Sequence, residues 1–266
     1  LQQVDEYAAL KYQEYIRKNI KPRSQNRYLS SLKSLFGHLE KRKFVSENPF
    51  SDVLLSKVGV KTIVTYCLTT PEASAILRHA EQRRREERVT WKRAKLHRNE
   101  LLFKILSTTA RRIGFVIDLK LSDIDLKGES VALRFKRKQS SEQERVELDP
   151  GTAQDLKEYL SLYHKDMTNH IHFLFFNSMH ITEKPAAYKS VSRAFDAACE
   201  KEGVNSSAVP HSFRVHAAVE WYKGGMPLRE IQLRLDHSSI EQTAKYIALA
   251  LGLPPEEFFK SLKGAA

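Results

Sequence analysis

Three short stretches of the sequence carry side chains that could act on a phosphate ester. The first is His211-Ser-Phe-Arg214, which directly follows Pro210. Positions three apart on a helix share a face, so one imidazole and one guanidinium would point at the same spot. A guanidinium can hold two oxygens of a phosphate, and an imidazole can exchange a proton near neutral pH. Surface neighbours often have the same spacing, so this pair alone does not define a site.

The second stretch runs from Leu235 to Tyr246 and places His237 nine positions before the tyrosine. Nine steps of about 100° would set the two side chains on opposite faces of one helix. However, Ser238-Ser-Ile-Glu241 has the pattern of a capping box, so we predict that a new helix begins just after His237. His237 would then lie on the preceding turn. Tyr246 would lie within the helix, where a core aromatic is the alternative role.

The third stretch, Thr109-Ala-Arg-Arg112, follows an apolar segment at 101–106 that predicts a buried helix. It leads into Leu121-Ser-Asp-Ile-Asp125. An arginine at the end of a buried helix can project into a cleft, and it can equally pair with a carboxylate. The residues alone leave both roles open for Arg112.

A β-hairpin is predicted between this stretch and the histidines. Apolar residues alternate with others from Ser130 to Arg137, and the pattern resumes over 145–148. Period two on both sides of the polar segment 139–142 is typical of two antiparallel strands joined by a turn. Lys136 and Lys138 fall where the first strand meets that turn.

Helices dominate the segments that must position these stretches. From Val4 to about Phe44 the apolar residues recur at helical spacing, which predicts two or more amphipathic helices. Pro22-Arg-Ser24 separates them, and Ser24 is predicted to cap the second.

A domain boundary is predicted after these front helices. Residues 56–67 show no helical stripe and predict an extended linker, whereas Thr69-Thr-Pro-Glu72 has the features of a helix start. We therefore expect domains at 1–65 and 66–266. Residues 82–95 are crowded with arginine and lysine, which is typical of a helix face open to solvent, with DNA contact as the alternative.

The remainder of the chain, from Thr152 onwards, is predicted to be largely helical. Its last segment begins with a helix-start signal at Leu253-Pro-Pro. Phe258, Phe259 and Leu262 would share one face of that tail helix, which could pack on its own domain or on a neighbouring protomer.

Composition favours a polyanionic partner. The 266 residues hold 44 Lys and Arg against 32 Asp and Glu, a net charge of +12, and the first 65 residues are the more densely basic part.

Two cysteines exclude a disulfide framework and a paired-cysteine zinc site. No apolar run is long enough to cross a bilayer and no leader opens the chain, so we expect a cytoplasmic protein, associated with the nucleoid when bound to DNA. The chain starts at Leu1 without methionine, which leaves a trimmed amino terminus open.

Taken together, the three stretches and the hairpin resemble the catalytic domain of the tyrosine recombinases. That family carries an arginine in a T-G-x-R-x-x-E stretch, a lysine in a β-hairpin, an H-x-x-R motif, and a Gly-His-Ser-Ser turn before a tyrosine nucleophile. The matching positions, over roughly residues 68–249, are Arg112, Lys138, His211, Arg214, His237 and Tyr246.

Three positions depart from the family pattern. Ala110 stands where the family usually has glycine before the first arginine, and Phe115 stands where it often has an acid. Asp236 replaces the usual glycine before the second histidine. These changes concern the support of Arg112 and of the turn, and none alters a reacting group.

The resemblance implies a mainly helical fold with a small antiparallel sheet, in which a helical core-binding domain and a catalytic domain close on DNA as a clamp. It also implies that Tyr246 attacks a DNA phosphate to give a 3′-phosphotyrosine and a free 5′-hydroxyl. Arg112 and Arg214 would stabilise the charge that develops on the phosphate oxygens.

Roles for the other matching residues follow from the same resemblance. Lys138 would protonate the leaving oxygen, with Lys136 as the fallback. His211 would accept the tyrosine proton or orient the tyrosine, and His237 would donate a hydrogen bond to the phosphate.

The resemblance implies neither metal nor ATP, and the sequence contains no phosphate-binding loop and no evident carboxylate cluster for metals. The pair His170-Ile-His172 is interpreted as surface histidines. The expected partners are a double-stranded recombination site and three further copies of the chain, joined through the C-terminal tail into a tetramer on two DNA sites.

Two alternative functions remain at this stage: a relaxing topoisomerase with the same chemistry, and a DNA-binding protein that keeps the fold without the reaction. Integration, resolution and Xer-type exchange are not distinguished by the motifs. The compact length shows no separate arm-binding domain, which favours a simple resolvase or an Xer-like enzyme.

Overall fold

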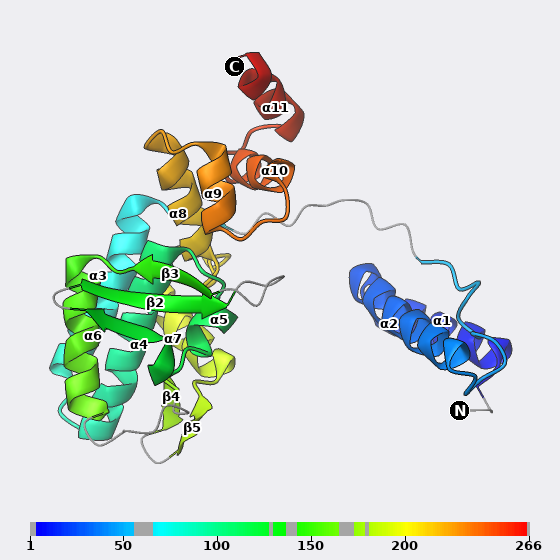
Figure 1. Cartoon of the computed structure of the whole chain (residues 1–266), viewed down its shortest axis with the longest axis horizontal. Helices are drawn as coiled ribbons and strands as arrows, with labels where there is room; N and C mark the ends of the chain where they lie inside the picture. Colours follow the sequence, from blue (N-terminus) through cyan, green and yellow to red (C-terminus); the bar gives the residue numbers. More distant parts are fainter. Residues whose placement is uncertain are drawn as a thin grey trace. The chain divides into compact units, whose positions relative to one another are not determined.

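The computed structural model describes residues 4–55, 66–127, 130–136, 143–164, 173–178 and 181–264. Its contacts divide the chain into two units, Leu1–Ile63 and Val64–Ala266 (Figure 1). Each unit has apolar clusters of its own. Of the predicted linker, only Tyr66 and Cys67 lie within the described residues. Among the described helices, none has the length and apolar character that a membrane span requires.

The smaller unit is built on two amphipathic helices, α1 (Glu6–Asn19) and α2 (Pro22–Lys41), as the spacing predicted. Their apolar stripes pack together with the chain that follows α2. Ile16 is fully buried, and the rings of Phe36 and Phe50 lie 5.2 Å apart, tilted by 42°. This local core fixes the hairpin of helices.

The predicted cap of the second helix is wrong. The helix α2 begins two residues before Ser24, with Lys21 in extended conformation as its N-cap residue and Pro22 at the first helical position. Proline suits that position because its φ is already helical and its missing N–H would have had no partner. Ser24 therefore lies inside the first turn.

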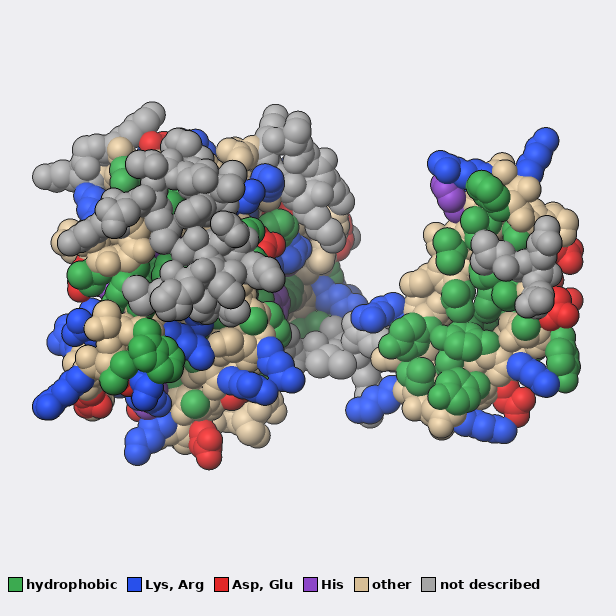
Figure 2. All heavy atoms as spheres, turned by 90° about the horizontal axis from the view of Figure 1, so that it is seen from below, with side chains coloured by type: hydrophobic (Ala, Val, Ile, Leu, Met, Phe, Trp, Pro, Cys, Tyr) green, Lys and Arg blue, Asp and Glu red, His purple; other side chains and the backbone are tan. Residues whose placement is uncertain are grey.

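Apolar and basic side chains share the surface of the smaller unit. Figure 2 shows hydrophobic side chains gathered on the face of this unit turned to the viewer, with Lys and Arg near its edge. The most exposed of its large apolar side chains are Tyr7, Tyr15, Phe44 and Leu54.

The larger unit carries the remaining elements. Its helices are α3 (Thr70–Glu86), α4 (Thr90–Thr109), α5 (Ile113–Ile117), α6 (Pro150–Tyr163), α7 (Tyr188–Lys201), α8 (Ser212–Lys223), α9 (Leu228–Arg234), α10 (Ile240–Ala250) and α11 (Pro255–Gly264). A short 3-10 turn, Leu121–Asp123, precedes the first strand. The strands are β1 (Ile124–Lys127), β2 (Ser130–Lys136), β3 (Gln143–Glu147), β4 (Phe176–Ser178) and β5 (Ile181–Pro185).

Several local predictions are confirmed in this unit. Thr69 and Glu72 form the capping box that starts α3, and the apolar segment 101–106 is the buried middle of α4. The hairpin is also confirmed: β2 pairs antiparallel with β3, and Leu133 lies opposite Val146.

The sequence analysis missed part of the β structure. The strand β1 pairs with β2 to complete a three-stranded antiparallel sheet in the order β1-β2-β3. The expected largely helical region beyond Thr152 also contains the two-stranded sheet β4-β5. These strands are only three to five residues long, too short for a clear period-two pattern.

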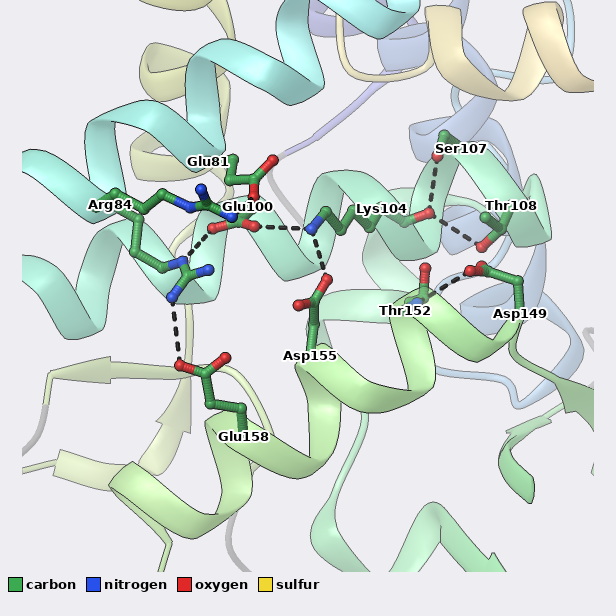
Figure 3. A network of polar contacts seen from close by, with 11 residues as sticks. Glu81, Arg84, Glu100, Lys104, Ser107, Thr108, Asp149, Thr152, Asp155 and Glu158 are labelled. Atoms are coloured by element: carbon green, nitrogen blue, oxygen red, sulfur yellow. Dashed lines mark hydrogen bonds and ion pairs between the residues drawn. The ribbon is translucent and has the colours of Figure 1, made fainter. Parts of the chain in front are cut away.

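An ion-pair network joins α3, α4 and α6 beside the main core (Figure 3). The carboxylate of Glu100, which is 0% exposed, accepts from Arg84 at 2.5 Å and from Lys104 at 2.8 Å. Arg84 also reaches Glu158 at 3.4 Å, and Lys104 reaches Asp155 at 2.5 Å. The basic segment 82–95 is therefore not uniformly solvated, because Arg84 is used within the fold.

A second apolar cluster lies at the C-terminal end of the unit and positions the last three helices. It includes Ala217 on α8, Ile231 on α9, Ile247 on α10 and Phe258 on α11. The ring of Phe258 lies 5.4 Å from that of Tyr222. The tail helix thus packs on its own unit, whereas the side chain of Leu262, expected on the same face, lies outside the described residues.

Candidate active site

The end of α4 brings the first arginine into the site. Ala110 closes the helix with a φ of 52°, and its N–H donates to the carbonyl of Leu106. This left-handed conformation favours glycine, which is the residue that the resembled family carries there. The turn separates two neighbouring arginines: Arg111 is buried against Glu144 on β3, while Arg112 starts α5 with its side chain partly exposed.

The first turn of α8 supplies the second arginine and the first histidine. Arg214 is only 2% exposed, and its guanidinium donates to the carbonyl of Ala110 at 2.6 Å and to the carbonyl of Leu235. One side chain therefore fastens the turn before Arg112 to the turn before His237. His211 is the N-cap residue of α8, so the pair lies on one face, as the spacing predicted.

The turn between α9 and α10 holds the second histidine. The backbone N–H of His237 donates to the carbonyl of Gln232, and the Gln232 side-chain amide donates back to the carbonyl of His237 at 3.1 Å. Nδ1 of His237 lies 3.0 Å from the hydroxyl of Thr243. These contacts hold both the turn and the ring of His237 in place.

The helix that carries the tyrosine begins where the sequence indicated, just after His237, although its cap is Ser239 and not Ser238. Tyr246 on this helix is not a plain core aromatic. Its phenolic oxygen lies 3.3 Å from Nε2 of His211, and its ring meets that of His237 edge to face at 5.5 Å.

Burial and positive charge act in opposite directions on the phenol. Burial raises the pKa of Tyr246 to about 12, although Arg214 and then Arg112 act to lower it. Burial, reinforced by the two arginines, lowers the pKa of His211 to about 4, and the same causes lower the pKa of His237 to about 4. Burial also lowers the pKa of Arg214 to about 10, which leaves it cationic at neutral pH. The resting site thus holds a protonated phenol beside a neutral imidazole that can accept its proton.

The structure brings five of the six predicted site residues together. The sixth, Lys138, lies outside the described residues, as does the pair His170 and His172. Lys136, the fallback, is the last residue of β2 and is exposed. Within the described part of the chain, no group of three or more His, Cys, Asp or Glu side chains could hold a metal ion.

Sequence reasoning missed the supports of these residues. Thr243 was not singled out, although it follows His237 by six positions in the first turn of the new helix. The two carbonyls that accept from Arg214 lie 104 and 21 positions away along the chain, so spacing gave no signal for them.

Comparison with known proteins gives the same class as the motifs: enzymes that recombine DNA through a tyrosine. A model of the phage integrase family matches residues 67–251, so the chain belongs to this family of tyrosine recombinases. The predicted resemblance and the predicted fold class, mainly helical with a small antiparallel sheet, are thereby confirmed.

Curated relatives support this assignment. A tyrosine recombinase of Agathobacter rectalis is 25% identical over 250 residues, covering 92% of this chain and 78% of the relative. Tyrosine recombinase XerC of Chlamydia caviae is 23% identical over 258 residues, covering 90% of this chain and 72% of the relative. Recombination is thus favoured over the two alternatives, topoisomerase and silent DNA-binding protein.

Solved structures share the fold. A XerH site-specific recombinase bound to difH substrate has a TM-score of 0.65 and 20% identity, over 92% of this chain and 68% of that one. A lambda integrase dimer bound to a COC′ core site has a TM-score of 0.59 and 17% identity, over 93% and 65%.

Proposed function

We propose that this chain is a site-specific recombinase that cleaves and rejoins DNA through Tyr246, with Arg112, His211, Arg214 and His237 as its further catalytic residues. The observation that carries the proposal is the placement of the phenolic oxygen 3.3 Å from an imidazole nitrogen, beside a buried arginine, in a member of this family. A phenol without such neighbours is a poor nucleophile.

The cleavage step exchanges one phosphodiester for another. A bond forms between the phenolic oxygen of Tyr246 and the phosphorus, and the bond from phosphorus to the 5′ oxygen breaks. The phenol proton passes to Nε2 of His211, and the 5′ oxygen takes a proton from Lys138, with Lys136 as the alternative. The product is a 3′-phosphotyrosine, which the 5′-hydroxyl of a partner strand attacks to rejoin DNA without an external energy source.

The geometry favours proton removal during the attack. With a pKa of about 12, forming the free phenolate at neutral pH would cost roughly 7 kcal/mol, at about 1.36 kcal/mol per unit. Nε2 of His211 lies within reach of the phenolic hydrogen and can accept it while the bond to phosphorus forms, so a free phenolate is not required. Arg112 and Arg214, fixed beforehand, stabilise the charge gained by the phosphate oxygens in the transition state.

Both units would bind the duplex, with residues 1–65 as a core-binding domain and 66–266 as the catalytic domain. Support comes from the net charge of +12 and from exposed lysines and arginines on both front helices, such as Lys11, Lys18 and Lys33. Contacts of this kind fall on backbone phosphates and weaken steeply with salt.

A tetramer on two DNA sites would form through the tail helix α11. The helix presents Phe258 and Phe259 on one apolar face and is joined to α10 by a short link at Gly252, whose φ is 71°. Such a link lets the same face fill the corresponding groove of a neighbouring subunit.

The nucleophile can be tested by trapping the protein on a nicked DNA substrate whose cleaved fragment diffuses away. The expected result is a covalent protein–DNA adduct with the wild-type chain and none with Tyr246→Phe, which still binds DNA in a mobility-shift assay. Sequencing the DNA held by the trapped protein would define the site. A covalent adduct that survives the substitution would overturn the assignment.

A further inference from the structure

A carboxylate lies beside one of the two arginines that are proposed to bind the phosphate. Oδ2 of Asp236 lies 3.5 Å from Nη1 of Arg112, and both side chains are partly exposed, at 24% and 33%. Asp236 follows Leu235, whose carbonyl accepts from Arg214, and precedes His237. The carboxylate thus pairs with Arg112 from the turn that also carries His237 and the carbonyl that accepts from Arg214.

The backbone at this position favours a residue without a carboxylate. Asp236 has a φ of 50°, in the left-handed region that glycine adopts at least cost, although aspartate tolerates it better than most residues. The conformation of the turn thus does not require the Asp236 side chain, because glycine would adopt the same backbone more easily.

The helix α5, which Arg112 precedes, offers no carboxylate side chain to pair with this arginine. Phe115, three positions further on, is partly buried against the main apolar core and offers no acceptor. In the part of the chain that the structure describes, Asp236 is the carboxylate that forms an ion pair with Arg112. Arg214, by contrast, is fastened by two backbone carbonyls.

We propose that Asp236 is a positioning residue that holds the guanidinium of Arg112 ready for the scissile phosphate. A guanidinium has five N–H donors, so a contact through one nitrogen leaves the remaining donors for phosphate oxygens. Fixing a long, partly exposed side chain in advance removes the cost of ordering it during the reaction. The inference rests on the proposed function.

The same carboxylate has an opposite effect on binding, because its negative charge lies beside the incoming phosphate. Positioning therefore favours the reaction step, while charge repulsion weakens the contact with DNA in the ground state. Removing the carboxylate should slow cleavage without weakening DNA binding, a combination that a purely structural role does not produce.

The test compares Asp236→Gly with Asp236→Asn in the full-length chain. Adduct formation on the nicked substrate is followed in single turnover at saturating DNA, together with DNA affinity and the unfolding midpoint. We expect Asp236→Gly to slow cleavage by about tenfold, with equal or tighter DNA binding and an equal or higher unfolding midpoint. Asp236→Asn keeps an acceptor oxygen and suits the same backbone conformation, so its cleavage rate should fall less than that of Asp236→Gly.

A second comparison isolates the route of the effect. If Asp236 acts through Arg112, then Asp236→Gly should cause no further loss in a chain that already carries Arg112→Ala. A Gly variant that cleaves as fast as the wild type, or an equal further loss in the Arg112→Ala chain, would overturn the inference. Failure of the wild-type chain itself to form an adduct would instead overturn the proposed function.

Discussion

At the scale of single residues, the site keeps its reactants in their neutral forms. Burial and the two arginines hold the pKa of His211 at about 4, and burial keeps the pKa of Tyr246 at about 12. Between these values neither group changes protonation. In the proposed mechanism, the phenol therefore loses its proton as its oxygen bonds to phosphorus.

The rate of adduct formation should accordingly be almost independent of pH between about pH 6 and about pH 9. On the acid side it should fall as His211, which faces Arg214, Arg112 and Tyr246, becomes protonated near its lowered pKa. Single-turnover rates across this range provide the check. A rate that climbs tenfold per pH unit through neutrality would show that the phenolate forms before attack.

Acid should also weaken the fold. The pKa values of His211 and His237 are lower in the folded chain than the ordinary value near 6.5, so the unfolded chain binds more protons between about 6.5 and about 4. Stability is thus present above the ordinary value and is lost as the pH falls toward 4. Circular dichroism at each pH is the control that separates this loss from the kinetic effect.

At the scale of elements, the ion-pair network fixes α4, the helix whose end presents Arg112. Glu100 lies in the middle of α4, fully buried, and accepts from cationic groups on α3 and α4 (Figure 3). A buried carboxylate shared by two cations is costly to remove, because Arg84 and Lys104 both lose their buried partner. Each cation then keeps only a more exposed carboxylate, Glu158 or Asp155.

Glu100→Gln should therefore lower the free energy of unfolding by about 3 kcal/mol. Glu158→Gln is the matched control, since its side chain is 44% exposed and lies 3.4 Å from Arg84. We expect the control to cost less than about 1 kcal/mol. Urea unfolding of the full chain measures both, and equal losses would show that Glu100 is not the centre of the network.

The sequence was sufficient to predict local elements, but it was not sufficient to predict long-range contacts. The capping box at Thr69, the hairpin β2-β3 and the start of α10 depend on residues a few positions apart, where spacing determines backbone geometry. The hydrogen bond from Arg214 to Ala110 spans 104 positions, and the pair of Arg112 with Asp236 spans 124. Such contacts arise from tertiary packing, and no regular spacing of residues in the sequence indicates them.

At the scale of the whole molecule, the proposed tetramer depends on how firmly the tail helix α11 packs on its own unit. Phe258 is 4% exposed in its own unit, yet the helix α11 to which it belongs is only 10 residues long. A short helix held mainly by one apolar face can detach from its unit at modest cost.

Phe258→Ala should abolish four-subunit complexes on DNA with two sites, because the anchor of the exchanged helix is lost. Light scattering of the protein–DNA complexes gives their mass, and the exposed neighbour Glu257→Gln serves as the control. Tetramers that assemble normally with Phe258→Ala would rule out the tail as the connecting element.

The two hydrogen bonds that Arg214 donates to backbone carbonyls make the proposed active site depend on a completed fold. Its guanidinium donates to the carbonyls of Ala110 and Leu235, so this arrangement exists only after two segments far apart in the sequence of the larger unit have met. A chain still emerging from the ribosome, or one cut short before Tyr246, holds no phenol among these cations. Partly made copies therefore lack the arrangement of side chains that the proposed cleavage requires.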